Sequence, residues 1–255
     1  MAKQCAICGV QMNVFQSQQL SDGNYICRKT CQKLGLKYLN YGKSSVEQVI
    51  AHNAQVARGT KLWEHYFVPR KKTSDKSKKL KKFSTIYVAE DIGLMALVEK
   101  RYKFMFWGKS EHVCVYRIAD LYKYDKISII ASVVNGKKKN EFYINFRFPN
   151  VEGLSNFQIK FSSSSTCNNI IKYFDTLYGI QTTLGNFTKQ MTNQIAAMKS
   201  AGSVAKSMLT GKVKDISDNQ LQEAIDTTSV ALYGDRTQWI EKADAALKEF
   251  DHSIQ

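Results

Sequence analysis

The sequence predicts an α+β protein with three parts: a small metal-binding module, an antiparallel β-domain of seven short strands capped by a helix, and a C-terminal helical extension. Three observations predict this architecture. Two close pairs of cysteines lie near the N-terminus, strand-like segments separated by turn residues follow residue 83, and apolar residues recur at helical spacing after residue 180. With 255 residues and 44% hydrophobic content, the chain can bury at least one substantial core.

Four cysteines have the spacing of a Zn(Cys)4 site. Cys5 and Cys8 form one pair, Cys27 and Cys31 form the other, and 18 residues separate the pairs. Four thiolates at about 2.3 Å complete a tetrahedral Zn²⁺ and leave no position for a substrate water, so we expect a structural metal. Two disulfides are the competing interpretation, which the absence of an apolar N-terminal signal segment disfavours.

The residues around these cysteines agree with a metal module over residues 1–43. Gly9 suits the tight turn of a zinc knuckle, and Asp22-Gly23 predicts a hairpin turn between the pairs. Cys27 and Cys31 lie one helical turn apart if a short helix begins there. The two remaining cysteines, Cys114 and Cys167, are expected to be buried small apolar side chains.

Residues 44–82 are predicted to form one short helix and a lysine-rich linker. A capping box at residues 44–47 begins the helix and Gly59 ends it. Trp63 lies in a segment that favours a buried strand or a helix end. His52, alone in the helix, is expected to be a surface or packing residue and not a ligand.

The positive charge of the chain is concentrated before residue 83. Residues 1–82 carry a net charge of +12 and residues 83–255 a net charge of +3. The centre of this charge is a run of eight cations, predicted to bind anions: Arg70, Lys71, Lys72, Lys76, Lys78, Lys79, Lys81 and Lys82. Two interpretations stay open, a solvated linker or a tether for lipid head groups or nucleic acid phosphates.

Seven strand candidates and one helix follow in residues 83–180. Asn135-Gly136 is the clearest two-residue hairpin turn, and alternation in 141–148 places Phe142, Ile144, Phe146 and Phe148 on one side. A helix at 168–178 should end at Gly179. The predicted strands are 85–89, 93–99, 103–107, 113–117, 126–134, 141–148 and 157–161.

Seven strands closed by one helix is the element order of a pleckstrin-homology-like (PH-like) sandwich or open barrel. The segment from Tyr116 to Tyr124 resembles part of bacterial pleckstrin-homology and GRAM-type domains. Together with the four cysteines, the chain resembles uncharacterised bacterial proteins that join a zinc-ribbon-like domain to such a β-domain. This resemblance covers roughly residues 1–180 and implies the fold and the zinc, but no activity.

The extension at 181–255 has apolar residues at helical spacing in 187–209, 221–232 and 239–250. The first stripe is rich in methionine, which favours packing on a protein over lying on a membrane. The last two suggest a helical hairpin that self-associates or binds a protein partner.

These observations predict a non-enzymatic adaptor protein that contains structural zinc. No P-loop, nucleophile elbow or HExxH motif occurs, and the four histidines are scattered. The basic segment is expected to engage an anionic membrane surface, and the C-terminal helices a protein partner or a second copy. Nucleic acid binding through the zinc module and the lysines is one alternative, and a structural or phage-defence interaction protein is another. The expected location is the cytoplasm, peripheral to the membrane if lipid is the partner.

Overall fold

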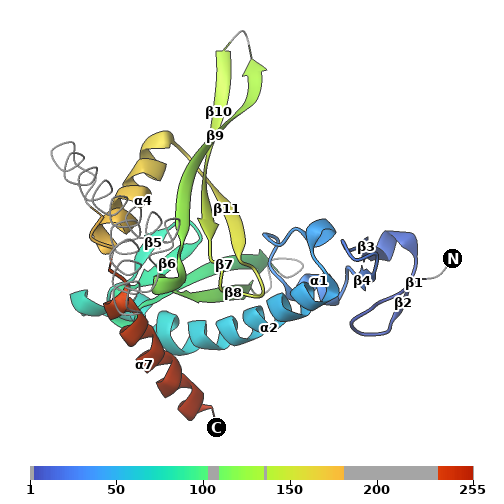
Figure 1. Ribbon diagram of the computed structural model, residues 1–255, viewed down its shortest axis with the longest axis horizontal. Helices are drawn as coiled ribbons and strands as arrows, with labels where there is room; N and C mark the ends of the chain where they lie inside the picture. Colours follow the sequence, from blue (N-terminus) through green and yellow to red (C-terminus); the bar gives the residue numbers. More distant parts are fainter. Residues whose placement is uncertain (1–2, 103–108, 135–136, 181–234, 255) are drawn as a thin grey trace, which may run out of the picture. The chain divides into compact units, whose positions relative to one another are not determined.

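The computed structural model describes residues 3–102, 109–134, 137–180 and 235–254 (Figure 1). The chain divides into two compact units. The first comprises residues 1–164 and 238–255, and the second comprises residues 165–237. The first unit holds the cysteines of the metal module, both larger sheets and the last helix, whereas the second holds most of helix α4. As predicted, the fold is α+β with antiparallel sheets.

The N-terminal module consists of two short antiparallel hairpins and one helical turn. Strand β1 (Lys3–Gln4) pairs with β2 (Gln11–Met12), and β3 (Ser17–Gln19) pairs with β4 (Tyr25–Cys27). Helix α1 spans Cys31–Leu34. Gly9 and Gly23 have φ angles of 72° and 81°, in the left-handed region that favours glycine, so both predicted turns are confirmed. Two 3-10 turns, η1 (Val14–Gln16) and η2 (Tyr41–Lys43), complete the module.

A long helical segment follows, where the sequence predicted a short helix and a linker. Helix α2 (Val46–Leu62) continues into a π-helical turn, η3 (Trp63–Phe67), and then into α3 (Val68–Lys72). The predicted end at Gly59 is wrong. A Cβ at this position would lie 2.2 Å from the carbonyl oxygen of Val113, so Gly59 is the point where the helix approaches strand β8 most closely. The N-cap is Ser45, whose side chain accepts a hydrogen bond from the backbone of Gln48.

Seven strands form two antiparallel sheets. The four-stranded sheet has the order β5 (Lys81–Phe83), β6 (Ile86–Ala89), β7 (Leu94–Tyr102), β8 (Lys109–Arg117). The three-stranded sheet has the order β11 (Asn156–Phe161), β10 (Lys137–Arg147), β9 (Lys123–Val134). Within the described residues these sheets do not join into one closed sheet, so the barrel form of the prediction is not observed.

Two details of the strand prediction differ from this arrangement. Strand β5 comes from the end of the lysine run and was not predicted, and the predicted strand 103–107 lies outside the described residues. At the predicted Asn135-Gly136 turn, Val134 pairs with Lys137, which leaves a two-residue connection between β9 and β10. A 3-10 turn, η4 (Lys76–Lys78), precedes β5, and two more, η5 (Glu90–Ile92) and η7 (Ile118–Asp120), link later strands.

The core of the first unit has two layers. One face of the four-stranded sheet packs on Leu62, Trp63 and Phe67 of the long helical segment. Tyr116 of β8 stacks on Phe148, with ring centroids 4.2 Å apart, and joins the two sheets. The alternation predicted for 141–148 is confirmed for Ile144, Phe146 and Phe148, which are fully buried, whereas Phe142 is half-buried. Cys114 and Cys167 are also buried, as predicted.

Helix α7 (Thr237–Ser253) closes the first unit. Its predicted apolar stripe is present, and Ala243, Ala246 and Phe250 join the core beneath the four-stranded sheet. The hydroxyl of Tyr66 donates a 2.6 Å hydrogen bond to the carbonyl oxygen of Ala246. This stripe is therefore buried within its own unit.

Helix α4 spans Ser164–Leu177, so it begins four residues before the predicted start at 168. Gly179, two residues after its end, has a φ of 70° and serves as the predicted stop. The predicted apolar segments 187–209 and 221–232 lie outside the described residues. No helix among the described residues is long and apolar enough to cross a bilayer.

Candidate functional site

The four N-terminal cysteines converge, and their thiol sulfurs all lie within 4.8 Å of one another. The Sγ atoms of Cys5 and Cys31 are 3.7 Å apart, and those of Cys8 and Cys27 are 3.6 Å apart. A tetrahedral metal with four sulfurs at about 2.3 Å has edges of about 3.8 Å, whereas a disulfide needs about 2.05 Å. All six cysteines of the chain are free thiols. The predicted set Cys5, Cys8, Cys27 and Cys31 can therefore hold a metal ion.

The local backbone prepares these sulfurs as ligands. The chain turns after Cys5, where Gly9 donates to the Cys5 carbonyl oxygen at 2.9 Å. The backbone N–H of Cys27 points at the Cys5 sulfur, and that of Cys31 points at the Cys27 sulfur, both at 3.3 Å. Hydrogen bonds to sulfur favour the thiolate over the thiol. Metal affinity rises in consequence, because the thiolate is the ligand form.

The pKa values of the four thiols diverge. Burial acts to raise the pKa of Cys5, but backbone hydrogen bonds from Cys8, Ile7 and Cys27 outweigh it and lower that pKa to about 6. Burial and the neighbouring thiols raise the pKa of Cys31 well above its usual value. Four adjacent thiolates repel one another, and a bound dication would remove this repulsion. The cluster is thus suited to a dication, which would let all four sulfurs bind as thiolates.

The segment that follows Cys31 is held by side chains from distant parts of the chain. Asn53 of α2 donates to the Cys31 carbonyl oxygen at 3.0 Å. Arg101 of β7 donates to the carbonyl oxygens of Lys33 and, at 2.5 Å, Gly35. Glu99, beside it on β7, accepts from the backbone N–H of Lys37 at 2.8 Å. These bonds fasten the metal module to the helix and the four-stranded sheet. Those from Asn53 and Arg101 also satisfy carbonyl groups in and just after the short helix α1.

His52 is a packing residue, as the sequence predicted. It is fully buried, and its Nε2 atom accepts a 2.8 Å hydrogen bond from the backbone N–H of Leu36. Gln55, one turn further along α2, lies 3.4 Å from the His52 Nδ1 atom and accepts from the backbone N–H of Leu154 at 2.9 Å. His52 and Gln55 therefore connect the metal module, α2 and the loop before β11. Sequence reasoning did not find Asn53, Glu99 or Arg101, because their partners lie far away in the sequence.

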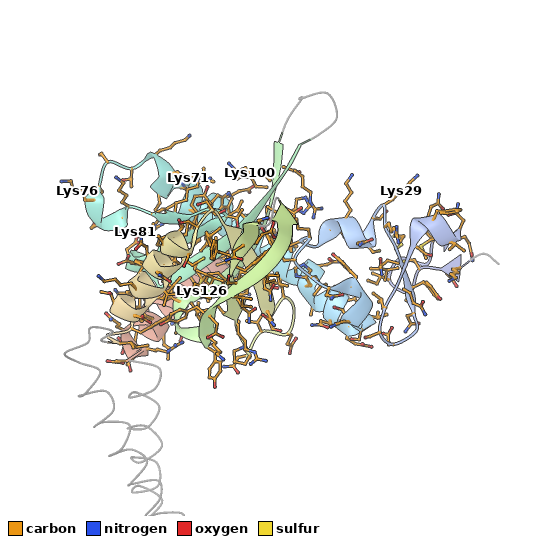
Figure 2. All side chains as sticks on the ribbon, turned by 90° about the horizontal axis from the view of Figure 1, so that it is seen from above. Lys29, Lys71, Lys76, Lys81, Lys100 and Lys126 are labelled. Carbon is orange, nitrogen blue, oxygen red and sulfur yellow. The ribbon has the colours of Figure 1, made fainter. Side chains whose placement is uncertain are left out.

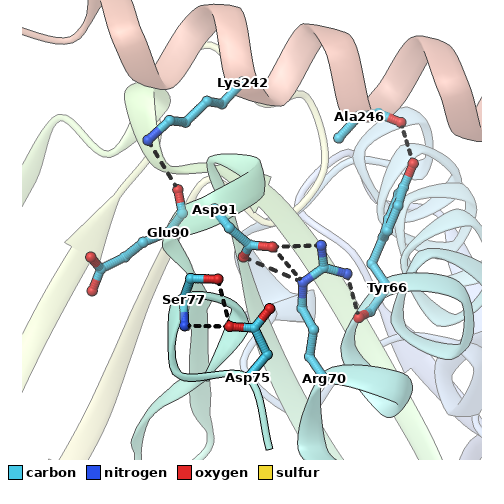
Figure 3. Close-up of polar contacts among 8 residues, drawn as sticks. All are labelled: Tyr66, Arg70, Asp75, Ser77, Glu90, Asp91, Lys242 and Ala246. Atoms are coloured by element: carbon cyan, nitrogen blue, oxygen red, sulfur yellow. Dashed lines mark hydrogen bonds and ion pairs between the residues drawn. The ribbon is translucent and has the colours of Figure 1, made fainter. Parts of the chain in front are cut away.

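The eight predicted anion-binding residues occupy three different environments. Arg70 forms an ion pair with Asp91 at 2.6 Å and also donates to the Tyr66 carbonyl oxygen (Figure 3). Its guanidinium is engaged inside the protein, with only 15% of the side chain exposed. Lys71 lies over an aromatic pair, with 29% of the side chain exposed. The remaining six are exposed: Lys72, Lys76, Lys78, Lys79, Lys81 and Lys82.

The exposed lysines sit on defined elements of the first unit. Lys76 and Lys78 belong to η4, and Lys81 and Lys82 belong to β5 (Figure 2). In η4, the carboxylate of Asp75 accepts hydrogen bonds from the backbone and hydroxyl of Ser77 at 2.9 and 2.7 Å, which fixes the turn. These four exposed cations therefore lie on short regular elements, whereas Lys79 lies between η4 and β5.

Comparisons of the chain with protein-family models, with curated proteins and with solved structures gave no match. The functional argument therefore rests on the cysteine cluster and on the placement of the charged side chains.

Proposed function

We propose that the cysteine cluster binds one structural Zn²⁺. The observation that supports this is that all four sulfurs lie within 4.8 Å of one another, with the Cys5–Cys31 and Cys8–Cys27 distances of 3.7 and 3.6 Å close to the edge of a tetrahedral site. An all-sulfur set of this size favours zinc among the common divalent ions, and it leaves no open position for a catalytic water. Zinc would hold the two hairpins and the start of α1 together and would contribute folding free energy.

We further propose that the two larger sheets form a PH-like β-domain. Supporting this is the order of elements along the chain, in which a four-stranded antiparallel sheet is followed by a three-stranded one and then by α4. A domain of this class is a scaffold for binding, and its fold alone names no ligand.

The chain as a whole is, in this proposal, a non-enzymatic adaptor that engages an anionic membrane surface through its basic segment. The observation that carries it is that six exposed lysines lie close together in the sequence within one compact unit, five of them on α3, η4 or β5. Each lysine near an anionic leaflet contributes about 1 kcal/mol of attraction. A protein partner or second copy would be contacted by residues 181–234, because the apolar stripe of α7 is buried in the first unit.

Nucleic acid binding is the second candidate function. It has weaker support, because single-stranded binding uses exposed aromatic rings on which bases stack. Trp63 and Tyr87 lie beside Lys71, but only 1% of Trp63 and 6% of Tyr87 is exposed. Both rings are therefore covered and cannot serve as stacking platforms.

Vesicle flotation at physiological salt tests the membrane proposal. The wild type is compared on neutral and anionic vesicles with a variant in which Lys71, Lys72, Lys78, Lys79, Lys81 and Lys82 are serine. We expect the wild type to float only with anionic vesicles and the variant to stay in solution. A wild type that stays in solution contradicts the membrane proposal and makes nucleic acid or a protein the leading partner.

A further inference from the structure

Three lysines from three separate elements meet at one edge of the interface between the long helical segment and the four-stranded sheet. Lys71 lies in the last turn of α3, Lys82 lies on β5 and Lys100 on β7, and Figure 2 shows Lys71 and Lys100 close together. Lys100 is paired with Glu111 of β8, and Lys82 is paired with Tyr87 of β6. The pairing places all these residues on the sheet face that the helical segment covers.

Glu111 lies between two of these lysines but forms no short ion pair with either. Its Oε1 atom is 3.8 Å from the Lys71 ammonium and 3.7 Å from the Lys100 ammonium. Charge-assisted hydrogen bonds are shorter, at about 2.7–2.9 Å. The other carboxylate oxygen accepts a 2.5 Å hydrogen bond from the indole N–H of Trp63. The shortest of these contacts of Glu111 is thus the hydrogen bond from Trp63, and its Oε1 atom makes no contact shorter than 3.7 Å with the two ammonium groups.

Aromatic rings form the floor of this cluster. The Lys71 ammonium lies 3.9 Å from the ring centroid of Trp63 and 5.2 Å from that of Tyr87. The Lys82 ammonium lies 5.5 Å from the Tyr87 centroid. Cation–π contacts of this kind hold a lysine head group in place and reduce the entropy that a ligand must remove. The heads remain reachable, because 29% of Lys71 and 48% of Lys100 is exposed.

The cluster carries three positive charges and one negative charge, and the repulsion is visible at Lys71. Burial lowers the pKa of Lys71, Glu111 raises it, and the charges of Lys100 and Lys82 lower it further. The overall pKa is below its usual value despite the nearby carboxylate. An anion with two negative charges would balance the net charge of +2 and would favour the charged form of Lys71.

We propose that Lys71, Lys82 and Lys100 form a binding site for a phosphate monoester, with Glu111 as an internal carboxylate that competes with the ligand. A phosphate monoester carries a charge of about −1.5 to −2 at pH 7 and offers three acceptor oxygens, which match the charge and donors of three ammonium groups. A phosphodiester carries only one charge. This inference rests on the proposed anionic-surface function and adds a head-group preference to it. The group can belong to a lipid or to a soluble phosphate.

Vesicles with two different head groups test this site. Equal fractions of phosphatidic acid, a monoester, or phosphatidylglycerol, a diester, are placed in phosphatidylcholine vesicles, and inorganic phosphate is titrated separately as the soluble probe. The double variant Lys71→Gln, Lys100→Gln should bind phosphatidic acid about tenfold more weakly. A loss of this size is expected when hydrogen bonds to a charged group are removed. Lys61→Gln with Lys248→Gln removes the same charge at exposed positions outside the cluster. This control should change binding less than about threefold.

Glu111→Gln is the most discriminating variant, because it removes the competing negative charge and keeps an acceptor for the Trp63 indole N–H. It should raise phosphatidic acid binding about fivefold, whereas disruption of the fold would lower it. Binding of the wild type to inorganic phosphate, lost in Lys71→Gln with Lys100→Gln, supports a soluble phosphate as the source. Binding only to phosphatidic acid vesicles supports a lipid head group.

Different results would overturn the phosphate site and the proposed membrane function. Equal binding to both anionic lipids, with no change in Glu111→Gln and a loss in Lys76→Gln with Lys78→Gln, overturns the phosphate site but leaves the membrane function in place. No binding of the wild type to either anionic vesicle overturns both.

Discussion

The backbone N–H of Leu36 donates a 2.8 Å hydrogen bond to the Nε2 atom of His52. Leu36 follows Cys31, the last cysteine of the cluster, by five residues, so this bond links the candidate metal centre to helix α2. An Nε2 atom that accepts cannot carry a proton, and the proton of the neutral ring therefore sits on Nδ1, which faces Gln55 at 3.4 Å. His52 holds the two parts together only in its neutral form.

This bond predicts a stability loss in mild acid. Burial lowers the pKa of His52. The hydrogen bond that Nδ1 donates to Gln55 and the charge of Glu99 oppose this shift, whereas the charge of Arg101 acts with burial. Cys114 also faces the ring. The pKa of His52 in the folded protein lies below the unfolded value of 6.5. Its contribution to the free energy of unfolding is therefore complete above pH 6.5 and is lost as the pH falls below 6.5 towards the folded pKa.

Urea unfolding of the wild type and His52→Gln between pH 7.5 and 5.5, both with excess Zn²⁺, measures this loss. The wild type should lose up to about 1.4 kcal/mol more per pH unit than the variant, the value for one proton. Equal slopes would show that His52 does not take up this proton on unfolding.

Gly59 predicts a strong and local packing effect. A Cβ at position 59 would lie 2.2 Å from the Val113 carbonyl oxygen and 3.0 Å from its carbon, both backbone atoms that cannot rotate away. We expect Gly59→Ala to lower the free energy of unfolding by about 3 kcal/mol. Gly42→Ala is the control, because its Cβ would meet only the Asn40 side chain at 3.7 Å, and it should change stability by less than about 1 kcal/mol. Similar stabilities of the two variants, from thermal or urea unfolding, would refute the close approach.

The sequence predicted the features that depend on local spacing. The cysteine pairs, the turns at Gly9 and Gly23 and the alternation of β10 are set by neighbouring residues, and all are present. The end of the first helix was predicted wrongly, because a glycine serves equally as a stop signal and as a point of close packing. Only the position of Val113, 54 residues later in the chain, distinguishes the two.

Pairings between distant residues could not be predicted from one sequence. The lysine run appeared uniform, yet Arg70 pairs with Asp91, Lys71 lies over Trp63, and Lys76 is exposed. Residues Asn53, Glu99 and Arg101, which fasten the metal module, carry no local motif. Their roles arise from tertiary packing, which brings polar side chains to backbone groups that a short helix leaves unpaired.

The Arg70–Asp91 pair predicts a coupling that a surface ion pair lacks. Three hydrogen bonds join the groups, and their side chains are only 15% and 20% exposed. A double-mutant cycle with Arg70→Met and Asp91→Asn should give a coupling of about 2 kcal/mol. The same cycle for Arg58 and Asp251, which are 53% and 48% exposed, should give less than about 0.5 kcal/mol. Equal coupling energies for the Arg70–Asp91 and Arg58–Asp251 pairs would mean that Arg70 is as solvated as its neighbours in the basic segment.

Helix α7 offers a test of whether its apolar stripe serves the first unit. Phe250 is 2% exposed and packs with Tyr66 in the core, whereas Ile240 is 43% exposed. Phe250→Ala should therefore lower the free energy of unfolding by about 3–4 kcal/mol, and Ile240→Ala by less than about 1 kcal/mol. A Phe250→Ala variant with wild-type stability would indicate that the stripe is not part of this core.

Metal content tests the central claim most directly, since the zinc proposal rests on the geometry of four sulfurs. Native mass spectrometry of protein purified without chelator should show one Zn²⁺ per chain, also in the control Cys167→Ala, whose cysteine lies outside the cluster. Cys5→Ser with Cys31→Ser should carry none and should unfold at lower temperature. A metal-free wild type, or zinc retained after both ligands are replaced, would contradict the account.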